Sequence, residues 1–335
     1  MNTTTIQFYR LRKKAIVISL LIAVIMLIAK LGAYFITNSA AIFSDAIESV
    51  VHILATSMAF YSIILSSKPA DDSHLYGHGN IEYFSAGVEG LFIIIASVYI
   101  IYNAIDNIII GTTLKQLDLG IYIISSAGII NLALGLYLIR MGKKTNSLTL
   151  TADGKHVLTD SFTSIGVIIG IVLVLITGFQ IIDPIVAILV ALNILHTGYN
   201  LIRGSIGGLM NETDKALLDK IVECLKSKRK DYWIDIHHLR FWESGENTFL
   251  DFHLTLPYYF NIRESHLEDE YIETSLQVGI PNAQARIHFD YCTDNLCKYC
   301  AYKDCEVRKE EHSIFLEWTE TKMLGEPIEP KEHIS

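Results

Sequence analysis

Residues 40–66 read AAIFSDAIESVVHILATSMAFYSIILS, a run in which apolar side chains surround a few ionisable ones. About 20 helical residues cross the hydrocarbon core of a bilayer, so this run is long enough to span a membrane. Further apolar runs of the same kind occupy the chain up to Gly204. The sequence therefore predicts six membrane helices, at residues 15–37, 40–66, 84–110, 119–139, 148–177 and 181–202.

The composition agrees with a polytopic membrane protein. Of the 335 residues, 51% are hydrophobic and only 19% are charged, which is too apolar for an ordinary soluble protein of this size. The net charge of -9 provides no basic surface for a phosphate backbone, so we expect no nucleic-acid partner. The first run lacks a small-residue cleavage site, and we interpret it as a retained span rather than a signal peptide.

Basic residues in the short loops predict the orientation in the bilayer. On one side of the predicted spans, the N-terminal segment and the loops carry Arg10, Arg12, Lys13, Lys14, Lys68, Arg140, Lys143, Lys144 and Arg203. On the opposite side, the loops carry only Lys115. Since Lys and Arg gather in cytoplasmic loops, we expect both termini in the cytoplasm. Compactness and the lack of a targeting segment favour a multi-pass protein of a prokaryotic plasma membrane.

After Gly204 the sequence becomes polar and predicts a small cytoplasmic α+β domain at residues 205–291, following the membrane domain at 1–204. We expect a helix at 213–227, strands at 236–242 and 248–256, a second helix that begins at Asn261 with Glu264 in a capping box, and a third strand at 286–291. The order is αββαβ, which is ferredoxin-like. Residues 292–335 form a cysteine-containing tail.

Ionisable residues inside two of the spans are the strongest functional signal, because a charge in lipid is costly unless it faces a cavity or a partner. In each span an Asp stands three residues before one potential ligand and seven before another, on one helix face. The residues are Asp45, Glu48 and His52 in the second span, and Asp153, His156 and Asp160 in the fifth.

If these two faces oppose each other, Glu48, His52, His156 and Asp160 supply two carboxylates and two imidazoles to one tetrahedral ion, a set that favours zinc. The same groups take up protons near neutral pH when no metal is bound. Asp45 and Asp153 have several open roles: supporting the ligands through hydrogen bonds, standing at the entrance of the site or joining helices, with direct ligation of the metal as a less favoured alternative.

The chain resembles the cation diffusion facilitators, a family of metal/proton antiporters, over the six spans and the cytoplasmic domain. The match runs without gaps from Lys30 to Asp160. It implies that the transport site is formed by Glu48 and His52 together with His156 and Asp160. The chain departs from the common zinc version, whose second-span pair is often two aspartates, and this departure leaves the preferred metal and the number of protons open.

Two further groups match metal sites of the same family. Asp71, His74 and His78, in the loop between the second and third spans, could bind a second ion. In the cytoplasmic domain the resemblance implies a zinc or similar cluster that bridges two subunits of a homodimer, distinct from the transport site. Its expected ligands are His237, His253, His266, His288 and Asp290.

Four of the five cysteines lie in the tail, with the spacing C-x4-C-x2-C-x4-C: Cys292, Cys297, Cys300 and Cys305. Since the cytoplasm is reducing, disulfides are not expected there. Thiolates grouped around a C-x-x-C favour a zinc knuckle, with an iron–sulfur cluster and a redox pair as alternatives. Such a site could sense cytoplasmic metal or brace the domain. Cys224, alone on an amphipathic helix, is expected to be a small buried residue.

The predicted function is efflux of a divalent cation by proton antiport, with zinc favoured and iron(II) or manganese as alternatives. The metal is the substrate, no organic cofactor is expected, and the partners are the bilayer, protons and a second copy of the chain. An enzyme is disfavoured because no H-E-x-x-H, G-x-S-x-G or Walker-type motif occurs. A membrane-anchored sensor that uses the cytoplasmic His and Cys sites without transport is the other hypothesis.

Overall fold

The computed structural model describes residues 3–111, 114–145, 147–245 and 247–328. The chain divides into two compact units, Met1–Leu209 and Met210–Ser335. The boundary lies five residues beyond the predicted one at Gly204, because the sixth helix continues to Leu209.

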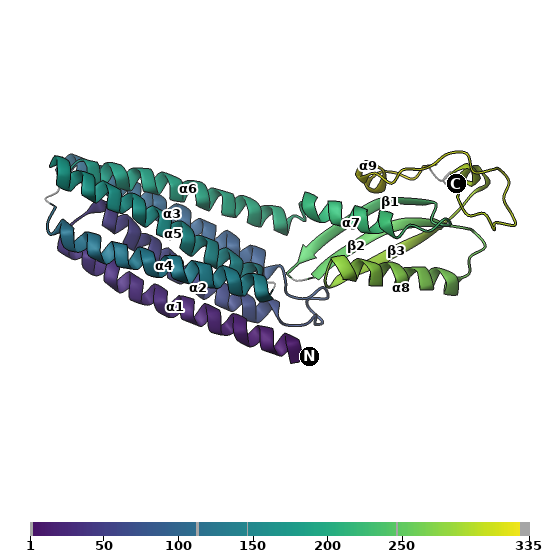
Figure 1. Cartoon of the computed structure of the whole chain (residues 1–335), viewed down its shortest axis with the longest axis horizontal. Helices are drawn as coiled ribbons and strands as arrows, with labels where there is room; N and C mark the ends of the chain where they lie inside the picture. Colours follow the sequence, from purple (N-terminus) through teal and green to yellow (C-terminus); the bar gives the residue numbers. More distant parts are fainter. Residues whose placement is uncertain (1–2, 112–113, 146, 246, 329–335) are drawn as a thin grey trace. The chain divides into compact units, whose positions relative to one another are not determined.

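The first unit is a bundle of helices that lie side by side (Figure 1). Six helices of the described chain are long and apolar enough to cross a membrane, which confirms the predicted membrane domain. They are α1 Thr3–Thr37, α2 Ala40–Ser66, α3 Ile81–Ile110, α4 Leu117–Thr145, α5 Leu148–Thr177 and α6 Ile182–Leu209.

Several helices extend beyond the predicted spans. Residues 3–14, 140–145 and 203–209 are helical, although hydropathy placed them outside the membrane. Hydropathy marks the part of a helix that lies in hydrocarbon, whereas backbone hydrogen bonding continues into water without a change of pattern. Ser39 and Ser147 cap α2 and α5, and each hydroxyl accepts a hydrogen bond from a backbone N–H of the first turn.

Small residues let the helices approach closely. A Cβ atom at Gly90 of α3 would lie 3.0 Å from the carbonyl oxygen of Gly198 in α6, and one at Gly135 of α4 would lie 2.9 Å from that of Gly154 in α5. Such contacts are typical of membrane bundles, where association depends on close packing rather than on the hydrophobic effect. They hold α3 against α6 and α4 against α5, and α5 is one of the two helices that carry the ionisable residues.

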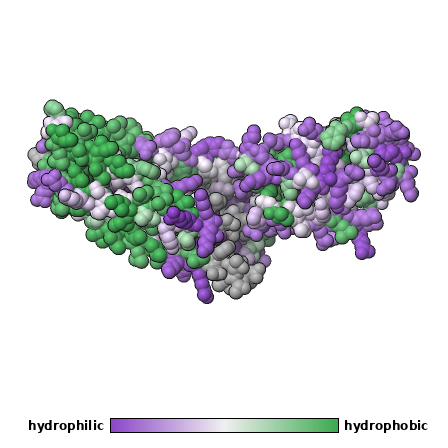
Figure 2. All heavy atoms as spheres, in the orientation of Figure 1, coloured by the Kyte–Doolittle hydropathy of each residue, from purple (hydrophilic) through white to green (hydrophobic). Residues whose placement is uncertain are grey.

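The face of the bundle that Figure 2 shows is largely apolar. Large side chains such as Leu21, Tyr122 and Ile176 are more than half exposed. A contiguous surface of this kind is unfavourable in water and suits a lipid environment.

The second unit has the predicted order αββαβ. It contains α7 Lys215–Ser227, β1 Asp235–Ser244, β2 Asn247–Leu256, α8 Ile262–Gly279 and β3 Ala283–Tyr291, followed by a short 3-10 helix η1 Asp294–Tyr299 and α9 Glu320–Leu324. The capping box of α8 is present, with Asn261 and Glu264 bonded reciprocally. The α+β fold predicted for this part of the chain is confirmed.

The strand order is β1-β2-β3, with β1 and β2 antiparallel and β2 and β3 parallel. The register sets His237 opposite His253, and His253 opposite His288. Three histidines therefore lie in one row across the sheet. A bulge in β1 follows His237, where His238 adopts a positive φ of 52°.

Candidate metal sites

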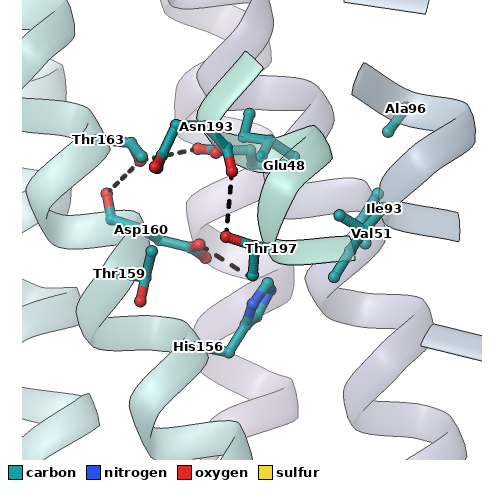
Figure 3. A pocket seen from close by; sticks show the side chains of 11 residues that line it. Glu48, Val51, Ile93, Ala96, His156, Thr159, Asp160, Thr163, Asn193 and Thr197 are labelled. Carbon is teal, nitrogen blue, oxygen red and sulfur yellow. Dashed lines mark hydrogen bonds and ion pairs between the residues drawn. The ribbon is translucent and has the colours of Figure 1, made fainter. Parts of the chain in front are cut away.

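A cavity inside the bundle is lined by side chains from α2, α3, α5 and α6. Figure 3 shows Glu48, His156 and Asp160 gathered around it. The Thr163 hydroxyl contacts both Glu48, donating to Oε2 at 3.0 Å, and the backbone oxygen of Asp160 at 2.9 Å. The His156 Nε2 atom lies 3.9 Å from Asp160 Oδ1. Two carboxylates and an imidazole, groups of the kind that bind divalent cations, thus face one space.

The His156 Nε2 atom is buried and has no hydrogen-bond partner among the described residues. A buried polar atom without a partner is costly and calls for an explanation, which a bound ion would provide here. The Glu48 and Asp160 side chains are also buried, at 6% and 4% exposure. Two buried carboxylates need positive charge nearby, and a divalent ion or protons would supply it.

His52 does not line this cavity. Its Nε2 atom lies 3.4 Å from Asp153 Oδ1, and its ring centroid is 5.7 Å from that of His156. Asp153 also accepts hydrogen bonds from Ser19 at 2.9 Å and from Thr56 at 3.1 Å. The structure therefore brings three of the four predicted transport ligands together, and pairs the fourth with a carboxylate whose role was left open.

Asp45 points to a different partner. Its Oδ1 atom lies 3.0 Å from Lys30 Nζ and accepts a hydrogen bond from Ser164 at 2.8 Å. Lys30 and Asp45 are both fully buried. Asp45 is therefore a partner in a helix-joining ion pair, one of the roles that the sequence left open.

The loop between α2 and α3 brings Asp71, His74 and His78 together. One ligand atom from each residue lies within 4.8 Å of the others. Asp71 Oδ1 is 3.3 Å from His74 Nδ1, and Asp71 Oδ2 is 3.4 Å from His78 Nε2. A hydrogen bond from the Ser73 hydroxyl, with further bonds from the backbone N–H groups of Ser73 and His74, lowers the pKa of Asp71 to about 2. The carboxylate is thus ionised and available to a cation at neutral pH.

In the second unit, one ligand atom each from His237, His253 and Asp290 lies within 4.8 Å of the others. Asp290 Oδ2 is 3.2 Å from His237 Nε2 and 2.9 Å from His253 Nδ1. The His288 ring lies tilted beside that of His253 with centroids 4.4 Å apart, and its Nε2 atom is 3.7 Å from Asp290 Oδ1. Four of the five residues predicted for this site therefore lie together, with Asp290 beside all three histidines of the row.

Burial acts to lower the pKa of His237, yet its hydrogen bonds to Asp235 and Asp290 raise it above the ordinary value. Asp235 Oδ2 lies 3.2 Å from His237 Nδ1. A carboxylate on the second ring nitrogen fixes the orientation of a histidine and leaves its other nitrogen free to bind a metal.

Two family models match this chain. The cation efflux transmembrane domain matches residues 16–210, and the cytoplasmic domain of cation efflux proteins matches residues 213–292. Together the matches cover most of the chain. This chain is a member of the cation diffusion facilitator family. The six spans and this membership confirm the predicted multi-pass membrane protein, and cation efflux is its family activity.

Curated relatives are similar over nearly their whole length. An uncharacterized transporter of Synechocystis is 35% identical over 286 residues, which is 85% of this chain and 92% of the relative. The cation-efflux pump FieF of Serratia proteamaculans is 27% identical over 86% of this chain and 95% of its own. A cadmium, cobalt and zinc/H(+)-K(+) antiporter of Bacillus subtilis is 30% identical over 76% and 81%, respectively. These relatives are bacterial, in agreement with the expected prokaryotic plasma membrane.

His266 of this transporter does not join the other cytoplasmic histidines. Its ring is exposed on α8, where Nε2 lies 3.5 Å from Glu270 Oε1. It lines a surface groove together with His288. The spacing in the sequence could not reveal this separation, because it depends on how α8 crosses the sheet.

The sequence analysis did not single out several residues of this transporter that contact the cavity or its ionisable residues from other helices. Lys30 is the one charged residue within the predicted span at 15–37, a signal that was available. Glu89 on α3 interacts electrostatically with His156 and His52. Asn193 and Thr197 of α6 line the cavity with no charge to mark them.

Proposed function

We propose that this chain is a homodimeric antiporter that exports a divalent cation, preferentially zinc, from the cytoplasm in exchange for protons. The observation that carries the proposal is the buried cavity in which Glu48, His156 and Asp160 face one another. The family activity supports the direction of transport, and the match to the cytoplasmic domain supports the dimer.

His52 completes the ligand set by a change of partner. In this conformation it faces Asp153, at 3.4 Å, and lies beside His156. Rotation of the imidazole toward Glu48 would give two imidazoles and two carboxylates around one ion, a neutral arrangement once a divalent cation is bound. Protonation of these groups on the far side would remove their affinity and release the ion. The cation and the protons then use the same residues at different times, with access alternating between the two faces.

The ligand chemistry favours zinc, because tetrahedral sets of imidazole and carboxylate suit it well. Iron(II), manganese, cobalt and cadmium use the same donors, so geometry and availability also contribute to selectivity. The relative from Bacillus subtilis is named for cadmium, cobalt and zinc, which supports zinc within a broader range.

The test is cation flux in proteoliposomes with an imposed pH gradient. Zinc uptake should saturate, collapse when the gradient is dissipated and fall to the level of empty liposomes in Asp160→Asn, which removes one carboxylate without a change of size. Asp106→Asn is the matched control, because Asp106 is exposed on α3 and should not affect flux. Competition by iron(II) and manganese ranks the ions. Normal flux in Asp160→Asn would refute the assignment of the site.

The cytoplasmic group of His237, His253 and Asp290 favours one other function, a membrane-anchored metal sensor. The same experiment separates the two. Tight zinc binding to the full-length protein with no flux under any gradient would support the sensor and contradict the antiporter.

A further inference from the structure

The four tail cysteines lie together at one end of the second unit. Cys300 is buried at 6% exposure and packs with Ile234 and Leu296, and Cys292 packs against the same cluster. Each of Cys292 and Cys300 interacts electrostatically with the other three thiols of the set. Residues that are thirteen positions apart along the tail are thus gathered into one neighbourhood by η1 and the turns that follow it.

Every one of the four sulfur atoms has a hydrogen-bond donor of its own. The backbone N–H groups of Tyr258 and Tyr302 donate to Cys292 and Cys300, respectively. The backbone N–H of Lys309 lies 3.5 Å from Cys297 Sγ, and the Tyr259 hydroxyl bonds to Cys305. Burial raises the pKa of Cys292 and Cys300, and the donors to their sulfur atoms act in the opposite direction. Hydrogen-bond donors to sulfur also surround thiolates that bind metal.

Arg308 fixes the backbone around these sulfurs. One guanidinium nitrogen donates to the carbonyl oxygen of Cys297 at 3.1 Å, and the other donates to those of Cys300 at 3.0 Å and Tyr302 at 2.6 Å. The backbone N–H of Cys300 donates to the Cys297 carbonyl at 3.2 Å, which closes the turn between the two cysteines. The guanidinium also interacts electrostatically with Cys300, so its charge offsets that of the thiolates.

We propose that Cys292, Cys297, Cys300 and Cys305 form a tetrathiolate zinc site that fastens the tail to the cytoplasmic domain. Four thiolates on a short segment suit one tetrahedral ion, and the C-x-x-C turn supplies two ligands from a single loop. An iron–sulfur cluster uses the same ligands but holds at least two irons. The site is separate from the transport cavity and does not depend on the proposed antiport.

Zinc binding would draw the sulfurs closer together. Among the described residues, two groups have three ligand atoms within 4.8 Å of one another: the loop group that contains Asp71 and the cytoplasmic group that contains His237. No three of the tail sulfur atoms, all of which belong to described residues, lie that close together. The ion would therefore tighten the segment between β3 and the stretch that carries Trp318. Structural zinc of this type contributes directly to folding free energy.

Cobalt substitution of the full-length protein tests the site. The other candidate ligand groups among the described residues, including the proposed transport site, contain only His, Asp and Glu, so a sulfur-to-cobalt charge-transfer band with strong tetrahedral d–d bands can arise only from cysteine. We expect these bands in the wild-type protein and in Cys224→Ser, the matched control, because Cys224 lies on α7 outside the group. They should be lost when the four tail cysteines are replaced by serine. Cobalt spectra without thiolate bands in the wild-type protein would overturn the proposal, whether or not the variant folds.

Zinc content and protection of the tail provide a second measurement. The purified wild-type protein should hold one more zinc ion per chain than the four-serine variant, and a thiol-displacing mercurial should release that ion. Removal of zinc should expose Lys303 and Lys309, which lie between and beyond the cysteines, to trypsin. Equal zinc content in both proteins would refute the site, as would acid-labile sulfide with visible absorption, the signature of an iron–sulfur cluster.

Discussion

Lys30 and Asp45 form a fully buried ion pair, in which the ammonium nitrogen of α1 lies 3.0 Å from a carboxylate oxygen of α2. Ser164 of α5 donates to the same oxygen at 2.8 Å. The ammonium also interacts electrostatically with Asp160 and Glu48. The pair thus joins α1, α2 and α5, of which α2 and α5 line the cavity, and it places an ammonium group near carboxylates in a low-dielectric interior.

Removing one member of this pair should destabilise the bundle strongly. Lys30→Met leaves a buried carboxylate uncompensated, and we expect a loss of about 3–5 kcal/mol. The fraction of protein that survives heating as a monodisperse size-exclusion peak measures the loss. The double variant Lys30→Met with Asp45→Asn removes both charges, so it should recover most of the stability. If the single and double variants lose the same amount of stability, the loss does not come from breaking the ion pair.

Asp153 should act on zinc affinity rather than on turnover. It accepts hydrogen bonds from Ser19 and Thr56 and faces His52 at 3.4 Å, so it positions that imidazole. Loss of such a partner weakens metal binding by about 10–100-fold. In proteoliposomes, Asp153→Asn should raise the KM for zinc by this factor and retain most of the maximal rate, because Glu48, His156 and Asp160 remain. Complete loss of flux at saturating zinc would instead make Asp153 a direct ligand.

Asp290 should control metal binding in the cytoplasmic domain, because one carboxylate contacts His237, His253 and His288. Asp290→Asn should weaken metal binding at the cytoplasmic site by about 100-fold or more, which exceeds the effect of losing a residue that only hydrogen-bonds to a ligand. The dimer fraction of the full-length protein in zinc, measured by light scattering, should fall, while part of the flux remains. Asp251→Asn on β2 is the control. If the variant loses metal but keeps its dimer fraction, metal binding at this site is not required for dimerisation.

The sequence was sufficient to single out Glu48, His156 and Asp160, three of the residues that line the cavity, because they follow helical spacing within apolar spans. It could not predict the pairings between helices. Which carboxylate His52 faces depends on the rotation of α2 against α5, and a one-dimensional spacing leaves that rotation undefined.

The cytoplasmic site shows the same limit. The order αββαβ and the capping box at Asn261 were predictable from local patterns, whereas the row of His237, His253 and His288 depends on strand register. Residues far apart in the chain meet only once that register is fixed. For this reason Asp235 and His238, which also lie against His237, were missed.

Trp318 should be essential for the fold of the second unit, although it follows the family match. It is 1% exposed, its ring stacks on Trp233 with centroids 6.5 Å apart, and Arg229 lies 4.2 Å above it. Trp318→Ala should destabilise this unit by about 3–5 kcal/mol. Phe315→Ala is the control, because Phe315 also contacts Arg229 but is 76% exposed, and its loss should change stability by less than about 0.5 kcal/mol.

Tryptophan fluorescence during thermal unfolding measures this effect selectively. The chain has three tryptophans, Trp233, Trp242 and Trp318, and all of them lie in the second unit. Trp233 and Trp242 therefore still report on that unit in Trp318→Ala, without interference from the bundle. A transition temperature equal to that of Phe315→Ala would show that the segment around Trp318 rests on the domain without stabilising it. A lower one, which we expect, makes the tail part of the core, because the buried indole fills space that no other side chain can occupy.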